Sequence, residues 1–288
     1  AVWWVLEPIP IAVTSIIPLA VFPMIGIIPR SVVAEQCGSK IILLLMGGFM
    51  LSVAMERCGL HLRLARGMHR LFGQKSDKGL VFAIMISAAM LSMWMSNTAV
   101  VLMFYPVVMA LIERAGRHEI AVPLLLGLAY AANVGGLGTP IATTPNLIFI
   151  DQYEKATGTE ITFSDWMWIG TPVVFVLVPL IWLWLTRSLK GRSDIDLPET
   201  GPWTVAEKRV LMIFTATAFF WVTRTNPWNG WTAWFSTDWI SFENAYDADT
   251  ALIAVIAMFL VTDGKGASLL DWESCKRIPW SVLLLVAG

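Results

Sequence analysis

Two long stretches of this sequence contain no charged side chain, and they limit the possible folds more than any other feature. Residues 80–112 and 122–150 hold no Asp, Glu, Lys or Arg. A helix that crosses the roughly 30 Å apolar core of a bilayer needs about 20 apolar residues. Only 14% of all residues are charged, whereas soluble domains carry about 25%. The sequence therefore predicts an all-α polytopic membrane protein.

Apolar segments predict the helices, and the charges between them predict the orientation. The segments are residues 9–28, 41–56, 79–112, 121–150, 166–186, 209–223, 250–262 and 280 onward. Residues 57–78 carry six Lys or Arg against one Asp, and basic loops are retained in the cytoplasm. Residues 225–249 carry four acidic residues, four Trp and no Lys or Arg, which is typical of an external loop. We expect a multi-pass protein of a cell membrane, specifically a bacterial inner membrane.

The segment 79–112 is too long for a single crossing. As one straight helix it would measure about 50 Å, and basic residues flank it at both ends. A segment whose two ends lie on the same side of the membrane is best explained by a re-entrant helical hairpin. Its tip would be Ser96-Asn97-Thr98, a compact polar cluster in the apolar run. Ser92 lies four residues before Ser96, so we expect both on one helix face.

The segment 121–150 contains a break in its middle. Residues 134–146 include three Gly and two Pro, and unwound backbone at membrane depth persists only where it is buried in protein or lines a polar cavity. Thr144 can serve as the N-cap of a second half-helix, with Pro145 in its first turn. We therefore predict a discontinuous transmembrane helix.

The two breaks would supply ligand groups without any charged side chain. The N-terminal end of a half-helix carries about half a positive charge and presents free N–H groups, which suit an anion. The C-terminal ends expose carbonyl oxygens. Together with Ser hydroxyls and an Asn amide oxygen, these carbonyls suit a hard monovalent cation.

A short repeat indicates an inverted-topology architecture. Residues 42–48, Ile-Leu-Leu-Leu-Met-Gly-Gly, resemble residues 282–288, Val-Leu-Leu-Leu-Val-Ala-Gly. The two copies would cross the membrane in opposite directions, which is typical of inverted-repeat transporters. The chain opens without an initiator Met and stops inside an apolar run, so we expect it to be part of a longer protein.

At these positions the sequence resembles the divalent anion–sodium symporter family of dicarboxylate and sulfate carriers. Ser96-Asn97-Thr98 matches the hairpin-tip signature of the family, residues 135–146 its broken-helix signature, and residues 278–285 the start of its second repeat. The resemblance covers nearly the whole chain. It implies scaffold helices with an interfacial helix (1–78), a transport-domain hairpin and broken helix (79–155), further scaffold helices with a cytoplasmic linker (156–240), and the truncated start of the second inverted repeat (241–288).

Carried over to this chain, the resemblance implies a sodium site between the hairpin tip and the broken helix. The sodium ligands would be Ser92, Ser96, Asn97, Gly138 and Ala142, the last two through their backbone carbonyls. Asn97 and Thr98 would also bind a carboxylate of the substrate. Ala142 stands where the family usually has Gly, which a backbone ligand tolerates if φ is negative.

The function implied by the resemblance is sodium-coupled secondary active transport of a small divalent anion. The substrate would be a C4-dicarboxylate such as succinate, or sulfate, carried by a homodimer in the lipid bilayer through an elevator motion. A sodium-independent dicarboxylate exchanger on the same fold is the alternative, and the Ser and Asn oxygens favour symport. No enzyme is expected, because the broken segments hold no Asp or Glu and every His falls in a predicted cytoplasmic loop. No basic stripe indicates nucleic acid.

Overall fold

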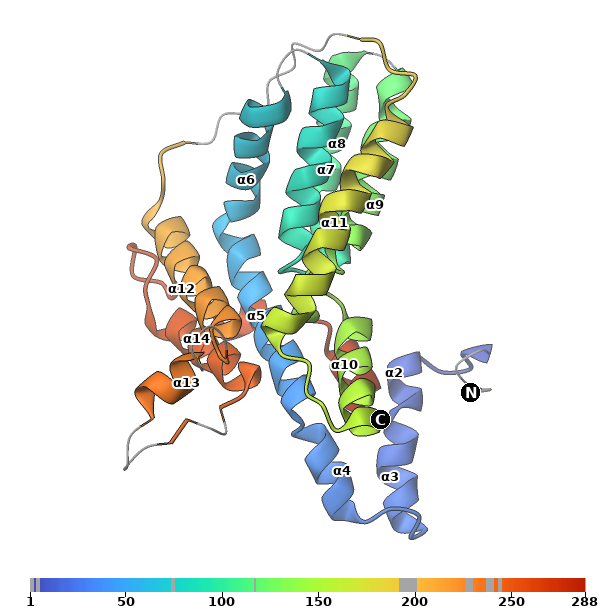
Figure 1. The fold of residues 1–288 in the computed structure, drawn as a ribbon, viewed down its shortest axis with the longest axis vertical. Helices are drawn as coiled ribbons and strands as arrows, with labels where there is room; N and C mark the ends of the chain where they lie inside the picture. The colour runs from blue at the N-terminus through green and yellow to red at the C-terminus, as the bar shows by residue number, and fades with distance from the viewer. Residues whose placement is uncertain are drawn as a thin grey trace.

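A computed structural model describes residues 3, 6–73, 76–116, 118–191, 201–225, 230–236, 241–242 and 245–287 of the chain. Within these ranges the regular structure is helical, with one isolated β-bridge between Thr262 and Ser268. The prediction of an all-α protein is confirmed (Figure 1). Much of the predicted external loop, including residues 226–229, 237–240 and 243–244, lies outside the described residues. The sidedness of the loops stays a prediction.

The helices follow the predicted segments. In chain order they are α2 (Ile11–Thr14), α3 (Ile16–Met24), α4 (Arg30–Cys37), α5 (Lys40–Cys58), α6 (Leu60–Met68), η1 (His69–Gly73), α7 (Asp77–Ser92), α8 (Asn97–Ala115), η2 (His118–Ile120), α9 (Ala121–Gly135), η3 (Pro140–Ala142), α10 (Thr144–Thr157), α11 (Phe163–Leu185), α12 (Val205–Val222), α13 (Gly230–Phe235), α14 (Asp247–Leu260), α15 (Trp272–Cys275) and α16 (Trp280–Ala287). In the described part of the chain, the stretches Arg30–Cys58, Asn97–Ala115 and Phe163–Leu185 are each long and apolar enough to span a membrane.

The segment 79–112 forms two helices. α7 ends at Ser92, and α8 begins at Asn97 after a short turn. Ser96 caps α8, because its hydroxyl accepts a hydrogen bond from the Ala99 N–H at 3.2 Å. The two helices lie side by side and run in opposite directions (Figure 1). The expectation that Ser92 and Ser96 share one helix face is wrong, because the helix stops between them.

The segment 121–150 is also interrupted. α9 ends at Gly135, the 3₁₀ turn η3 covers Pro140–Ala142, and α10 begins at Thr144. The N-cap of α10 is Thr143, one residue earlier than predicted. Pro145 then occupies the second helical position, where its missing N–H costs no hydrogen bond. Among the described residues, Glu7 is the one non-glycine residue with positive φ. The φ of Ala142 is therefore negative, and Ala142 does not adopt the left-handed conformation.

Small residues let two pairs of helices approach closely. A Cβ atom added to Gly135 on α9 would lie 2.7 Å from the Cα atom of Ala89 on α7. A Cβ atom added to Gly47 on α5 would lie 2.7 Å from the Cβ atom of Ala251 on α14. Such positions allow membrane helices to pack backbone against backbone. Accordingly, α7 packs mainly on α9, and α5 packs mainly on α14 (Figure 1).

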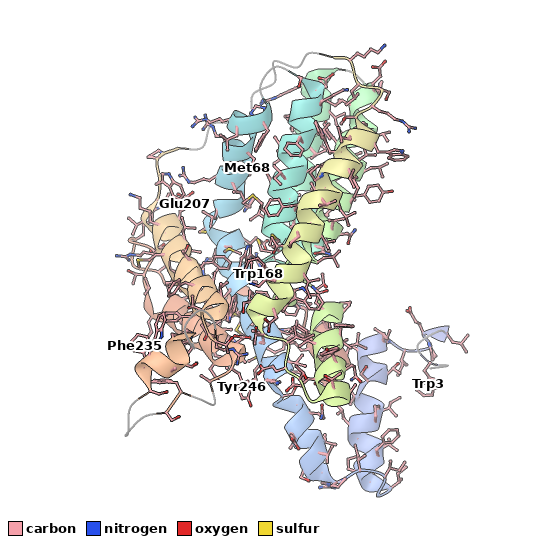
Figure 2. The ribbon with its side chains drawn as sticks, in the orientation of Figure 1. Trp3, Met68, Trp168, Glu207, Phe235 and Tyr246 are labelled. Atoms are coloured by element: carbon pink, nitrogen blue, oxygen red, sulfur yellow. The ribbon has the colours of Figure 1, made fainter. Side chains whose placement is uncertain are left out.

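An aromatic cluster anchors the turn between α7 and α8. The Trp94 ring stacks on Phe163 and Trp221, with ring centroids 6.1 and 6.4 Å away, and meets Phe214 edge-on at 5.2 Å. Offset and edge-on ring pairs add stabilisation to the buried area. The turn is therefore held against α11 and α12. Outside this cluster the surface of α11 is apolar: Trp168 is 80% exposed, as expected of a lipid-facing side chain (Figure 2).

Candidate functional site

The two helix breaks lie directly against each other. Thr139 is fully buried and donates its hydroxyl hydrogen to the Met93 carbonyl in the turn between α7 and α8. Gly138 packs on the same residue, since an added Cβ atom would lie 2.7 Å from the Met93 Cε atom. The turn of the hairpin and the break between α9 and α10 therefore form one packed unit.

Asn97 lies at the centre of this unit. Its Oδ1 atom accepts a hydrogen bond from the Ser92 hydroxyl at 2.6 Å, and its Nδ2 atom donates to the Asn133 Oδ1 atom at 3.2 Å. Gly136 lies against the amide, because an added Cβ atom would be 2.6 Å from Oδ1 and 2.9 Å from Nδ2. Ser92 is fully buried and Asn97 is half-buried. Residues of α7 and of the end of α9 thus fix the position of this side chain.

Asn146 fixes the shape of the break between α9 and α10. It is 5% exposed, and its Nδ2 atom donates to the carbonyls of Gly136 at 2.7 Å and Thr139 at 2.9 Å. These carbonyls lack helical partners because α9 has ended, and buried carbonyls need donors. A single amide group therefore supplies two hydrogen bonds that the backbone cannot make.

α11 supplies donors to the same break from the opposite side. The Trp166 Nε1–H donates to the Leu137 carbonyl at 2.9 Å, and the Thr171 hydroxyl donates to the Gly138 carbonyl at 3.3 Å. The second bond is long for a hydroxyl donor. The unwound backbone is thus bounded by α7, α10 and α11, as required of irregular backbone within a membrane protein.

An open cleft of about 690 Å³ reaches the first turns of α8 and α10. It is lined by Phe49, Glu56, Ser96, Asn97, Thr98, Ala99, Leu102, Met103, Ala142, Thr143, Thr144, Pro145, Arg277, Pro279 and Val282. Free N–H groups and a partial positive charge gather at helix N-termini, so two such ends beside one cleft favour an anion. The charged side chains of this lining are Glu56 and Arg277.

The predicted site residues do not all occupy equivalent places. Ser92 and Asn97 are hydrogen-bonded, Ser96 caps α8 and lines the cleft, and the exposed Thr98 lines the same cleft. Of the remaining two, Ala142 lines the cleft and Gly138 packs against Met93. Sequence reasoning missed Asn133, Gly136, Thr139 and Asn146. The sequence signal for Asn133 and Asn146 was that each is a polar residue in a run without charges. No local pattern shows which groups either side chain forms hydrogen bonds with.

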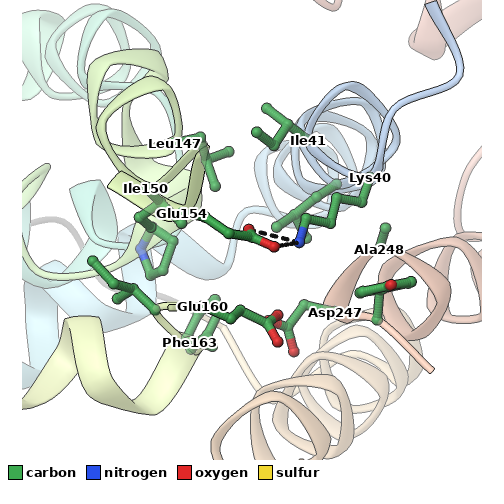
Figure 3. A pocket seen from close by; sticks show the side chains of 13 residues that line it. Lys40, Ile41, Leu147, Ile150, Glu154, Glu160, Phe163, Asp247 and Ala248 are labelled. Carbon is green, nitrogen blue, oxygen red and sulfur yellow. Dashed lines mark hydrogen bonds and ion pairs between the residues drawn. The ribbon is translucent and has the colours of Figure 1, made fainter. Parts of the chain in front are cut away.

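A second polar cluster connects α5 and α10 with the segment around α14 (Figure 3). The Lys40 ammonium pairs with the Glu154 carboxylate at 2.7 Å. Arg224, whose side chain is 6% exposed, pairs with Glu160 at 2.8 Å and with Asp247 at 3.0 Å. Because each of these carboxylates contacts a cationic side chain, we interpret the cluster as a structural link between helices rather than a ligand site.

In this structure, interrupted helices meet in a packed core, and their N-termini open to a cleft beside neutral oxygens. These features define the class of helical secondary transporters. Among the described residues, no group of three His, Cys, Asp or Glu is placed to hold a metal ion. The oxygens at the breaks are those of Ser, Thr, Asn and the backbone.

Comparison with known proteins gives the family. The model of the citrate transporter family matches residues 1–288, and the chain belongs to this family. It is 36% identical over 313 aligned residues to the sodium-dependent dicarboxylate transporter SdcS of Staphylococcus saprophyticus subsp. saprophyticus, an alignment that covers 100% of this chain and 59% of the relative. It is 33% identical over 314 residues to the protein of the same name from Staphylococcus aureus, covering 100% of this chain and 58% of that relative.

The chain thus spans about three-fifths of the length of the curated relatives it matches. The resemblance to sodium-coupled dicarboxylate carriers that the motifs predicted is confirmed, because both relatives bear that name. The family and the relatives are transporters and not enzymes, in agreement with the prediction.

Proposed function

We propose that the intact protein uses a sodium gradient to carry a small dianion, a C4-dicarboxylate such as succinate, across a bacterial inner membrane. One observation carries the proposal: the N-terminal ends of α8 and α10 line the same cleft, directly beside the Ser92–Asn97 oxygen pair. An anion site and a cation site would therefore share the Asn97 side chain. The names of the relatives support the choice of sodium and dicarboxylate.

The sodium ion would bind at the break between α7 and α8. The Ser92 hydroxyl oxygen and the Asn97 amide oxygen lie 2.6 Å apart, and the C-terminal ends of α7 and α9 add partial negative charge. In this proposal the ligands are Ser92, Ser96, Asn97 and the backbone carbonyls of Gly138 and Ala142. The Gly138 carbonyl would exchange its long, 3.3 Å bond from Thr171 for the ion.

The dianion would bind in the cleft. One carboxylate would accept hydrogen bonds from the Asn97 amide, the Thr98 hydroxyl and the Thr144 N–H at the start of α10. A bound sodium ion would place a positive charge next to this carboxylate and would order the shared Asn97 side chain. Both effects make binding of the ion and binding of the substrate mutually favourable.

Helix packing supports a division into a moving and a static part. α7, α8 and α9 pack on one another, whereas α5 packs on α12, α14 and α16; α6 and α11 lie at the boundary, because they pack on α7. We assign residues 79–155 to a transport domain in which α7–α8 is a re-entrant hairpin and α9–α10 a discontinuous helix. Residues 1–78 and 156–240 belong to a scaffold, and residues 241–288 begin the second inverted repeat. The scaffold would hold a homodimer together while the transport domain moves as an elevator.

Uptake of labelled succinate into proteoliposomes tests the proposal. We expect uptake when an inward sodium gradient is imposed and little uptake when choline replaces sodium. Unlabelled sulfate and a monocarboxylate such as acetate, added outside, show whether the site selects dicarboxylates among small anions. Equal uptake in sodium and in choline would show that transport is not coupled to sodium. Uptake that requires unlabelled succinate inside the liposomes, and no sodium, would identify an exchanger instead.

A further inference from the structure

The hydrogen bonds of Asn97 belong to a chain that begins at a backbone carbonyl of α9. The Asn133 Nδ2 atom donates to the Ala129 carbonyl at 3.0 Å. The Asn133 Oδ1 atom accepts from the Asn97 Nδ2 atom at 3.2 Å, and the Asn97 Oδ1 atom accepts from the Ser92 hydroxyl at 2.6 Å. Three side chains from three helices are thus linked in series.

The direction of this chain is fixed at its α9 end. A backbone carbonyl can only accept hydrogen bonds, so the Asn133 amide must turn its NH₂ group toward Ala129 and its oxygen toward Asn97. Asn97 must then turn its own NH₂ group toward Asn133. An Asn amide without such neighbours can adopt either orientation at little cost, so the anchored partner decides which one is populated.

The orientation of Asn97 matters because its two ends have opposite uses. With the NH₂ group toward Asn133, the amide oxygen lies beside the Ser92 oxygen, where it can bind a cation. The second N–H of the same NH₂ group is left for a carboxylate in the cleft. The opposite orientation would direct N–H groups at the cation and remove the donor for the anion. Gly136, whose position leaves no room for a Cβ atom, lets the amide rest against the end of α9.

We infer that Asn133 is the positioning residue that orients the Asn97 amide for sodium on one side and for the substrate carboxylate on the other. The inference rests on the proposed function and assigns no ligand contact to Asn133 itself. Asn133 is exposed on α9, so its replacement leaves the packed core intact.

Two variants of Asn133 separate orientation from packing. Asn133→Leu removes the acceptor for Asn97, whereas Asn133→Asp keeps it, because a carboxylate can only accept; the Asp variant gives up the exposed hydrogen bond to the Ala129 carbonyl. Gln152→Leu, the loss of an exposed amide on α10 outside the cleft, is the matched control. The measurements are the sodium concentration for half-maximal succinate uptake and the rise in unfolding temperature of the purified protein with NaCl, without succinate.

We expect Asn133→Leu to raise the half-maximal sodium concentration about fivefold, the size of one lost hydrogen bond, and to leave the maximal rate near that of the wild type. Asn133→Asp should stay at or below the wild-type value, and Gln152→Leu should match it. A wild-type sodium dependence in Asn133→Leu would overturn the inference, as would equal impairment of the Leu and Asp variants. Failure of sodium to affect the unmodified protein would instead overturn the proposed function, and this inference with it.

Discussion

Gly136 and Asn97 show how little space the site leaves at the scale of single residues. A Cβ atom on Gly136 would lie 2.6 Å from the Asn97 Oδ1 atom and 2.6 Å from the Thr143 Cγ2 atom. The backbone of Gly136 has φ −58° and ψ −14°, which any residue adopts. Glycine is therefore needed here for space, so that the amide of Asn97 can rest on the end of α9.

Gly136→Ala should abolish most transport without unfolding the protein. The added methyl group would displace the Asn97 amide from Ser92 and Asn133, because a contact of 2.6 Å cannot be kept. We expect succinate uptake at sub-saturating sodium to fall at least tenfold, with the protein still monodisperse in detergent. Gly67→Ala on α6, where an added Cβ atom meets nothing within 4 Å, is the control. Wild-type uptake by Gly136→Ala would show that Asn97 is not part of the site.

At the scale of the helix, the function depends on where helices end. α7 and α9 stop in the middle of apolar runs, and the carbonyls at their ends are bonded by Thr139 in the unwound stretch and by Asn146 on α10. Asn146 makes two of these bonds. Unpaired buried carbonyls would otherwise destabilise the break, since each costs about 1–3 kcal/mol.

Asn146→Leu isolates the role of this donor, because the side chain keeps about the same size and carries neither an NH₂ group nor a charge. The leucine side chain would face the Gly136 and Thr139 carbonyls with no hydrogen to donate. We expect the free energy of unfolding to fall by about 2–4 kcal/mol, from two lost hydrogen bonds. Thermal unfolding in detergent measures the loss as a lower transition temperature. An unchanged transition temperature would mean that the break does not depend on Asn146.

The helix breaks could be predicted from the sequence because their causes are local. A Gly- and Pro-rich stretch disfavours a continuous helix, and Ser is a preferred N-cap at which a new helix begins. The same spacing rules failed for Ser92 and Ser96, since they assume an unbroken helix. The bond between Asn97 and Asn133 joins residues 36 positions apart. It exists only because α8 and α9 pack side by side, which no local pattern encodes.

At the scale of the whole molecule, an ion pair links the scaffold to the transport domain that we propose. The pair Lys40–Glu154 joins α5 to α10, and both side chains are about one-third exposed, at 33% and 31%. Exposed pairs of this kind contribute about 0–1 kcal/mol. In an elevator motion α10 would move past α5, so this contact would separate in each cycle at little cost.

Joining α5 to α10 covalently should stop such a motion. We propose Lys40→Cys with Glu154→Cys in a background where Cys37, Cys58 and Cys275 are replaced by Ser, and cross-linking with a short cleavable bis-maleimide. Uptake should fall to the level of empty liposomes after cross-linking and should return after cleavage of the linker. Each single Cys variant, treated alike, is the control. Full transport by the cross-linked protein would contradict the division into a moving and a static part.

In the proposed mechanism a cation at the Ser92–Asn97 oxygen pair creates the dianion site, and calorimetric titration of succinate into the purified protein measures this coupling. In the unmodified protein, replacing choline with sodium should lower the Kd for succinate at least tenfold. In Ser92→Ala, which removes one neutral oxygen from the proposed cation site, most of that difference should vanish. The same Kd in sodium and choline would show that the dianion site forms without the cation, and an undiminished sodium effect in Ser92→Ala would show that the cation binds elsewhere.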